Sequence, residues 1–103
     1  MLKHCVFIRF RPEISTEQRV ALYQALQSLE SQLSGWLGFL AGANVTPELG
    51  MDKGYNGGFI IDFADEAARD AYLQNPDHQQ LGQRLVAAAV DGVAGIMVFD
   101  LLC

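Results

Sequence analysis

Apolar residues recur along this chain with two different spacings, and the two spacings alternate. Four short, largely apolar runs have the pattern of β-strands: residues 2–10, 37–46, 57–63 and 95–102. Three segments place apolar side chains two to four positions apart, which predicts amphipathic helices: residues 16–34, 66–73 and 76–90. The apolar series of the first helix continues as far as Trp36. The chain therefore predicts one domain over residues 1–103, with the element order β-α-β-β-α-α-β.

Polar residues mark where two of these helices begin. Ser15 and Gln18 have the spacing of a capping box, in which the Gln18 side chain reaches back to the Ser15 amide. Asn75 before Pro76 combines a good N-cap with proline at the first helical position. Gly35 predicts the end of the first helix. The glycine-rich residues 50–55 predict a loop.

This element order is the split βαβ repeat of the ferredoxin-like type, a four-stranded antiparallel sheet with helices on one face. Both alternating sides of the first strand are largely apolar, although the helices can cover only one. Residues on the uncovered side would be Cys5, Phe7 and Ile60. The last strand is apolar at almost every position, so its pattern alone leaves open whether Met97, Phe99 and Leu101 join them. Such a face is too apolar to remain in water. We therefore expect a second copy to cover it and to form a dimeric α+β barrel.

Composition narrows the possible partners. Twelve acidic residues against 7 basic ones give a net charge of −5, which disfavours nucleic acid and anionic membrane surfaces. No run approaches the roughly 20 apolar residues that span a bilayer. Cys5 and Cys103 form no disulfide framework, and Asp62 and Asp100 have no evident third ligand, so we expect no metal site. A cytoplasmic protein without a cofactor is the expectation.

Few polar residues stand among apolar neighbours, and His78 is the most informative of them. Counted from the Asn75 cap, it takes the third helical position, where free amides and the helix dipole disfavour positive charge. The neutral imidazole favoured there is the form that a general base needs. Asp77 beside it acts in the opposite direction. For His4 and Tyr72 the simpler interpretation is a structural role in the core.

Several short motifs together resemble one known family, the stress-responsive A/B barrel domain proteins. The motifs are Lys3-His4-x-Val6-x-Ile8-x-Phe10, Gly42-x-Asn44-Val45, Gly54-Tyr55, Tyr72-Leu73-x-x-Pro76-x-His78 and Val98-Phe99-Asp100. The resemblance implies the dimeric α+β barrel fold. One member of the family is a plant polyketide cyclase that works by aldol condensation without a cofactor. The resemblance implies a catalytic pair at Tyr72 and His78, with His4 in the cavity wall.

Two functions remain open at this stage. In the first, the protein is a homodimer of unspecified role, and the same residues are simply core. In the second, it is a cofactor-free enzyme or binder for a small carbonyl or polyketide-like compound, with His78 as base and the Tyr72 hydroxyl stabilising the enolate oxygen. The apolar pocket would be lined by His4, Val6, Ile8, Leu22, Leu26, Phe59 and Val98. A monooxygenase of the same superfold is disfavoured, because the sequence pattern differs.

Overall fold

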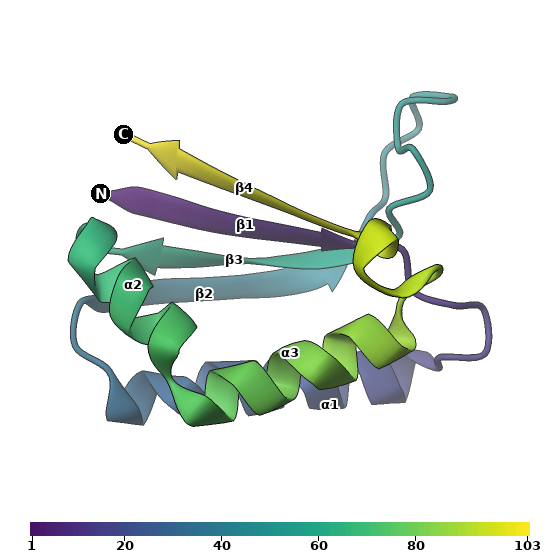
Figure 1. Ribbon diagram of the computed structural model, residues 1–103. Helices are drawn as coiled ribbons and strands as arrows, with labels where there is room; N and C mark the ends of the chain where they lie inside the picture. Colours follow the sequence, from purple (N-terminus) through teal and green to yellow (C-terminus); the bar gives the residue numbers. More distant parts are fainter.

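Four antiparallel strands form one sheet in the computed structural model, which describes all 103 residues (Figure 1). The strands lie in the order β2-β3-β1-β4, so β1 is central and β2 and β4 are the edges. Their bounds are β1 Leu2–Ile8, β2 Trp36–Ala43, β3 Gly57–Phe63 and β4 Ile96–Leu102. The topology is that of the ferredoxin-like α+β fold, as the sequence pattern predicted.

All the helices lie on one side of this sheet, and both chain termini lie at the same end of it (Figure 1). The helical segments are α1 Thr16–Gln27, the 3₁₀ turn η1 Ser28–Gln32, α2 Glu66–Gln74, α3 Pro76–Ala88 and the 3₁₀ turn η2 Gly92–Gly95. None of the helices is both long enough and apolar enough to cross a membrane. One sheet face is therefore covered by the chain itself and the other is not.

Both predicted helix caps are present. The Ser15 hydroxyl accepts a hydrogen bond from the Gln18 amide at 3.1 Å, and the Gln18 side chain accepts one from the Ser15 amide at 2.8 Å. The Asn75 side chain accepts hydrogen bonds from the amides of Asp77 and His78 at 2.9 and 3.1 Å. These bonds satisfy amides that the first helical turn leaves free, and so they fix where α1 and α3 begin.

The end of the first helix was predicted too late. The α-helix stops at Gln27, the 3₁₀ turn η1 follows, and Trp36 opens β2 instead of continuing the apolar series of the helix. The Ser28 hydroxyl donates to the Ala25 carbonyl at 2.6 Å, a local bond that competes with regular helix. Gly35 has φ +77° and redirects the chain, and a Cβ there would stand 2.7 Å from the Ala68 Cβ.

Other element ends differ from the prediction by one to three residues. The first strand stops at Ile8, and Phe10 forms only an isolated bridge with Ala89. The last helix ends at Ala88 instead of residue 90, and the last strand begins at Ile96 instead of residue 95. Element ends are the least reliable part of any prediction from sequence pattern, because fraying and local capping decide them.

Another difference concerns the second strand, which ends at Ala43 and not at residue 46. Residues 44–56, which we call the arm, leave the sheet there. They rise on the side opposite the helices (Figure 1). The Asn44 amide donates to the Asn56 carbonyl at 3.0 Å, and the Asn44 side chain donates to the Tyr55 carbonyl at 2.8 Å. These two bonds close the base of the arm, so the chain folds back on itself instead of extending the strand.

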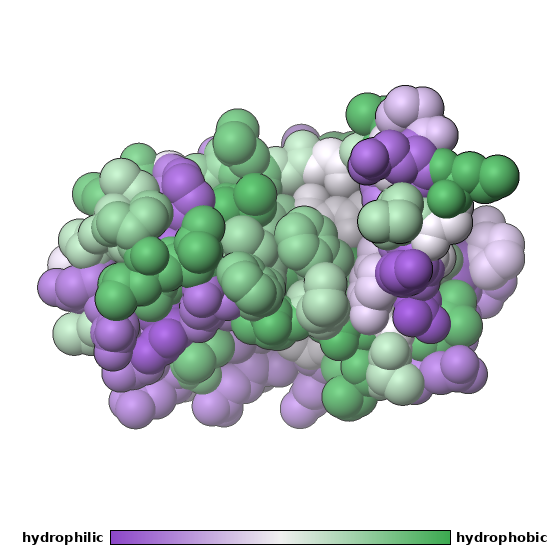
Figure 2. Space-filling model, turned by 90° about the horizontal axis from the view of Figure 1, so that it is seen from above, coloured by the Kyte–Doolittle hydropathy of each residue, from purple (hydrophilic) through white to green (hydrophobic).

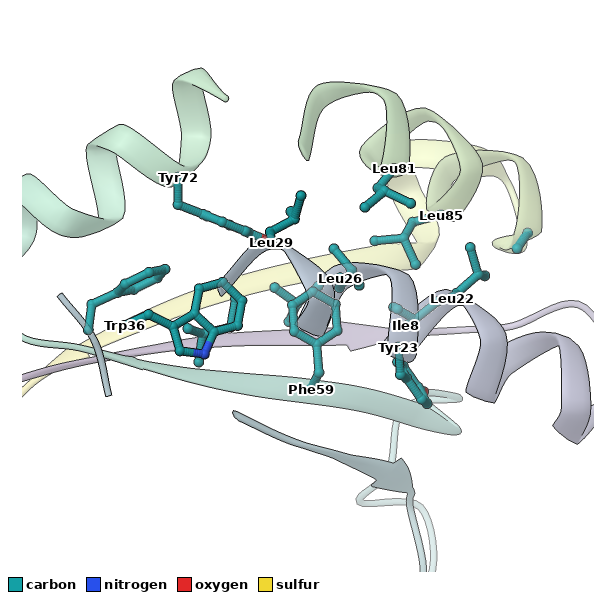
Figure 3. Packing of buried hydrophobic residues seen from close by; sticks show 14 of the residues in the cluster. Ile8, Leu22, Tyr23, Leu26, Leu29, Trp36, Phe59, Tyr72, Leu81 and Leu85 are labelled. Carbon is teal, nitrogen blue, oxygen red and sulfur yellow. The ribbon is translucent and has the colours of Figure 1, made fainter. Parts of the chain in front are cut away.

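The core lies between the helices and the covered face of the sheet (Figure 3). Leu26 of α1, Ile61 of β3 and Phe63 of β3 have no exposed surface. Trp36 and Phe39 stack with ring centroids 6.0 Å apart, and Phe59 continues the stack at 5.8 Å from Phe39. Aromatic rings of β2 and β3 therefore form one continuous part of this core, and the Phe59 ring also lies 6.3 Å from the Tyr23 ring of α1, measured between centroids.

The opposite face of the sheet has no cover from its own chain. The strand register aligns Cys5 with Phe99 and Phe7 with Met97, so these side chains share that face. Leu40 is 72 % exposed and Phe99 is 55 % exposed. Figure 2 looks onto this face and shows apolar side chains extending across the sheet. The prediction of an uncovered apolar face is confirmed, and the register settles which residues of β4 belong to it.

Candidate functional site

The corner between α2 and α3 brings Tyr72 and His78 together. Tyr72 lies in the last turn of α2 and His78 in the first turn of α3, and between them Asn75 takes an extended conformation. Two residues that are six positions apart thereby face the same interior. Their ring centroids are 4.0 Å apart, which is direct contact. Figure 3 shows the Tyr72 side chain extending from α2 into the core toward Leu29.

His4 approaches the same centre from the sheet. It lies on the covered face of β1, is 3 % exposed, and has its ring centroid 5.5 Å from that of Tyr72. Its Nδ1 is 2.6 Å from Oδ1 of Asp100, its direct partner across β1 and β4. The second carboxylate oxygen of Asp100 accepts from the Arg69 guanidinium at 3.0 Å. The structure thus brings the three predicted residues into one cluster and adds an ion pair behind His4.

Aromatic rings close this cluster on the side of the sheet. Phe63 lies 5.4 Å and Trp36 5.9 Å from the Tyr72 ring, measured between centroids. Phe63 also lies 6.1 Å from the His4 ring. Tyr72 itself is 0 % exposed. The polar atoms of the cluster therefore lie in a surrounding of low polarity, where a hydrogen bond is stronger and a charge is more costly than in water.

Burial sets the protonation of the two predicted catalytic side chains. Burial lowers the pKa of His78 below its ordinary value of 6.5; the Leu73 backbone acts against this shift, and His4 adds to it. Burial also raises the pKa of the Tyr72 hydroxyl above its ordinary value of 10. At neutral pH the histidine is therefore neutral, and the tyrosine keeps its proton. The pair combines a base with a hydrogen-bond donor.

Two details refine the sequence-based interpretation of His78. The first cause of its lowered pKa is burial. Asp77, which we expected to oppose the shift, instead accepts a hydrogen bond from the Gln32 side chain at 3.0 Å. His78 Nδ1 is buried and has no hydrogen-bond partner. An unpaired buried nitrogen is costly, and such atoms in native proteins call for an explanation.

The other predicted lining residues are divided by position. Most of them belong to the same continuous core as Tyr72: Val6, Ile8, Leu22, Leu26 and Phe59. Val98 also points to the covered side, since it pairs with Val6. It is nevertheless 55 % exposed, because β4 is an edge strand that no helix overlies.

Neither of the two main surface cavities is lined by Tyr72 or His78. The larger, about 880 Å³, lies between the uncovered sheet face and the arm, with Phe7 and Met51 among its lining residues. The smaller, about 350 Å³, is lined by α1, α3 and nearby residues, including Arg11 and Arg84. No group of three or more His, Cys, Asp or Glu side chains is placed to hold a metal ion.

Asp100 and Arg69 were not predicted as site residues. Asp100 is the single charged residue of β4, and its alignment with His4 was available only once the register was known. A charged residue within an otherwise apolar strand was the signal that could have identified it. Arg69 gave no such signal, because an arginine on a short amphipathic helix is ordinary.

Known proteins with this structure include enzymes and proteins without an assigned role. A dimeric ferredoxin-like protein of unknown function from Jannaschia sp. CCS1 is 34 % identical, with 99 % of this chain and 98 % of that chain covered and a TM-score of 0.89. A hydroxynitrile lyase from Passiflora edulis is 16 % identical, with 99 % and 92 % covered and a TM-score of 0.81. An antibiotic biosynthesis monooxygenase is 19 % identical, with 100 % and 98 % covered and a TM-score of 0.72.

A search of curated proteins finds no match. The sequence matches the stress responsive A/B barrel domain over residues 2–103, nearly its whole length. The ferredoxin-like order of elements agrees with this match. The chain therefore belongs to the stress-responsive A/B barrel domain family.

Proposed function

We propose that the protein acts as a homodimer, and that each copy holds a small, mostly apolar carbonyl compound against Tyr72 and His78. The observation that carries the site is the buried, unpartnered Nδ1 of His78 in contact with a neutral tyrosine. With the ring proton on Nε2, this nitrogen offers a free lone pair inside an apolar surrounding. A carbonyl compound supplies both a weakly acidic C–H for that lone pair and an oxygen for the tyrosine.

The dimer rests on the uncovered sheet face. Two large apolar side chains, Leu40 and Phe99, are exposed there. Their contact with water is unfavourable, and a second copy packed on this face would remove it. The Jannaschia protein, 34 % identical over nearly the whole chain, is described as dimeric. Such an interface would leave the covered face and the cluster at Tyr72 within each copy. Each copy would then carry its own site.

The chemistry that these two side chains can perform is proton removal next to a carbonyl. His78 takes the proton from the α-carbon, and the electron pair of that C–H bond moves to form the enolate. The enolate oxygen accepts a hydrogen bond from the Tyr72 hydroxyl, which stabilises its charge. His4, held by Asp100 at 2.6 Å, packs against the Tyr72 ring and orients it. The step needs no cofactor.

Access to this centre requires a movement within the chain. Tyr72 has no exposed surface, so a ligand reaches its hydroxyl only if the corner between α2 and α3 moves away from the sheet. Three polar contacts hold the corner: Arg69 with Asp100 at 3.0 Å, the Asn75 side chain with Gln32 at 3.1 Å, and Gln32 with Asp77 at 3.0 Å. All three are exposed, so solvent can replace them at small cost.

The test is hydrogen–deuterium exchange at the carbon next to the carbonyl of 2-octanone, followed by proton NMR in D₂O. We expect the wild type to exchange faster than buffer, His78→Gln to return to the buffer rate, and Tyr72→Phe to lose about tenfold or more. Tyr23→Phe is the matched control, because Tyr23 is also a buried tyrosine but lies away from this cluster beside Gly57. Wild-type exchange at the buffer rate would refute the catalytic part of the proposal.

A second candidate is a dimeric binding or interaction protein in which Tyr72 and His78 only fill the core. The observation that favours it is the complete burial of Tyr72, together with two surface cavities that both lie elsewhere. Imidazole NMR signals of His78 separate the two. Signals that stay unchanged with 2-octanone at millimolar concentration, together with no α-exchange, would favour this second function.

A further inference from the structure

The arm, residues 44–56, is firmly held at its base although it leaves the sheet. The Asn56 side chain accepts from the Phe10 amide at 2.8 Å and donates to the Phe10 carbonyl at 3.0 Å. The Arg9 guanidinium lies over the Tyr55 ring, 4.7 Å from its centroid. Beyond the base, the Met51 amide donates to the Glu48 carbonyl at 3.1 Å. The arm thus has a defined shape without packing on a core.

Although the arm has a defined shape, its apolar side chains are exposed. Leu49 is 99 % exposed, Val45 is 87 % exposed and Met51 is 62 % exposed. Leu49 is the most exposed of the large apolar residues of the chain. A single exposed leucine is ordinary, but three apolar side chains on one preorganised segment are a surface suited to binding.

The arm is continuous with the uncovered sheet face. The groove of about 880 Å³ is lined on one side by Phe7, Ile60 and Met97 of the sheet, and on the other by Val45 and Met51 of the arm. In Figure 1 the arm rises on the same side as this face, at the end of the sheet away from the termini. Whatever covers the sheet face therefore also meets the inner side of the arm.

We propose that the arm is a clasp that closes over the second copy in the dimer, with Leu49 and Val45 packed against the partner's surface. This inference rests on the proposed homodimer and names a part of its interface that the sheet alone does not provide. Because a two-fold dimer uses the same patch twice, each copy gives one arm and receives one. The partner then fills each groove, and the apolar side chains of both arms become buried.

A small ligand in the groove would not account for the arm. Leu49 is not among the residues that line the groove, so a ligand bound there would leave this side chain in water. Only a surface that extends past the rim of the groove reaches both Leu49 and the sheet. A second copy supplies such a surface, because its own sheet face is apolar and equally uncovered. Preorganisation of the arm reduces the entropy that such binding costs.

The experiment compares Leu49→Ser with Leu73→Ser by sedimentation equilibrium of the full chain. Leu73 is the matched control: it is 41 % exposed on α2, on the helix side of the molecule. We expect Leu49→Ser to weaken the dimer by about tenfold or more and Leu73→Ser to change its Kd by less than about twofold. Equal Kd values for Leu49→Ser and wild type would overturn the clasp while leaving the sheet-mediated dimer standing.

Hydrogen–deuterium exchange of the wild type gives a second measurement that needs no variant. The amides of residues 44–56 should exchange more slowly above the dimer Kd than below it, whereas those of α2 should not change. If the protein dimerises but the exchange of the arm amides does not depend on concentration, the second copy does not contact the arm. This result would overturn the proposal. A wild type that stays monomeric at all concentrations overturns the clasp and the proposed dimer together.

Discussion

The two faces of the sheet are both apolar, yet within one chain one face is buried and the other is exposed. On the covered face Ile61 is completely buried and Val6 is 5 % exposed, whereas on the other face Leu40 is 72 % exposed. The difference does not come from hydrophobicity, because β1 carries apolar residues on both sides. It comes from connectivity: both crossover segments place their helices on the same side. Apolar surface that the chain cannot reach with its own helices stays uncovered, and we propose that another copy covers it.

The polar pairs on the two faces differ in the same way. His4 and Asp100 are cross-strand partners on the covered face, and His4 is nearly buried. Lys3 and Asp62 are cross-strand partners on the uncovered face, with an N–O distance of 2.8 Å and substantial exposure of both side chains. Water competes with the second pair more than with the first, because the His4 side chain is buried and the Lys3 side chain is not. Two polar contacts of similar length therefore differ in how much they contribute to the free energy of unfolding.

The largest effect should come from removing a ring of the covered face. Phe63→Ala leaves a cavity beside Trp36 and Tyr72, and we expect it to lower the free energy of unfolding by about 3–5 kcal/mol. Phe99→Ala on the uncovered face, placed in a monomeric Phe7→Asp background, should cost less than about 1 kcal/mol. Urea denaturation followed by circular dichroism measures both. Equal losses would mean that the two faces are equally packed within one copy.

Phe7→Asp tests the uncovered face directly. An unpaired carboxylate in the proposed interface should weaken the dimer by about a hundredfold or more, and leave the secondary structure of the monomer unchanged. Phe7→Leu, which keeps the face apolar, should remain dimeric. Light scattering at micromolar concentration measures the mass. A monomeric wild type under these conditions would contradict the barrel arrangement.

The polar pairs provide the next smaller effect. Asp100→Leu leaves a buried His4 nitrogen without a partner, and we expect a loss of about 1–3 kcal/mol in the free energy of unfolding. Asp62→Leu removes the exposed pair with Lys3 and should cost less than about 1 kcal/mol. Both variants are compared by urea denaturation in the Phe7→Asp background. The comparison fails if Asp62→Leu is the more damaging of the two.

The smallest effect concerns pH. The pKa of His78 is lower in the folded chain than in the unfolded chain. As the pH falls, the unfolded chain therefore binds a proton at His78 before the folded chain does. The stability that neutral His78 provides is complete above its ordinary pKa of 6.5, and is lost as pH falls through the lower folded value. Wild type should therefore lose stability between neutral and mildly acidic pH more steeply than His78→Gln. NMR titration of the imidazole locates the pKa, and a value at or above 6.5 would contradict this.

The same sequence patterns that located the elements also located two helix caps, one of them beside the candidate site. Ser15, Asn75 and Pro76 act through bonds to neighbouring residues, so their caps could be predicted from local sequence. The family resemblance indicated Tyr72, His78 and His4, and the structure places their rings in one cluster. The role of these residues in catalysis stays a prediction. Trp36 was assigned to the wrong element, because an apolar residue at helical spacing fits a helix and a strand start equally well.

By itself, the sequence determined the order of elements, the alternation of β1 and the acidic surface, since each depends on residues within a few positions of one another. Only the tertiary structure decided the rest. The pairing of His4 with Asp100 needed the register of two strands 96 positions apart. The burial that lowers the pKa of His78 needed the packing of three elements around it. Local pattern treated residues 44–46 of the arm as the end of a strand. The base of the arm is instead held by Asn56 bonded to Phe10, a contact between residues 46 positions apart.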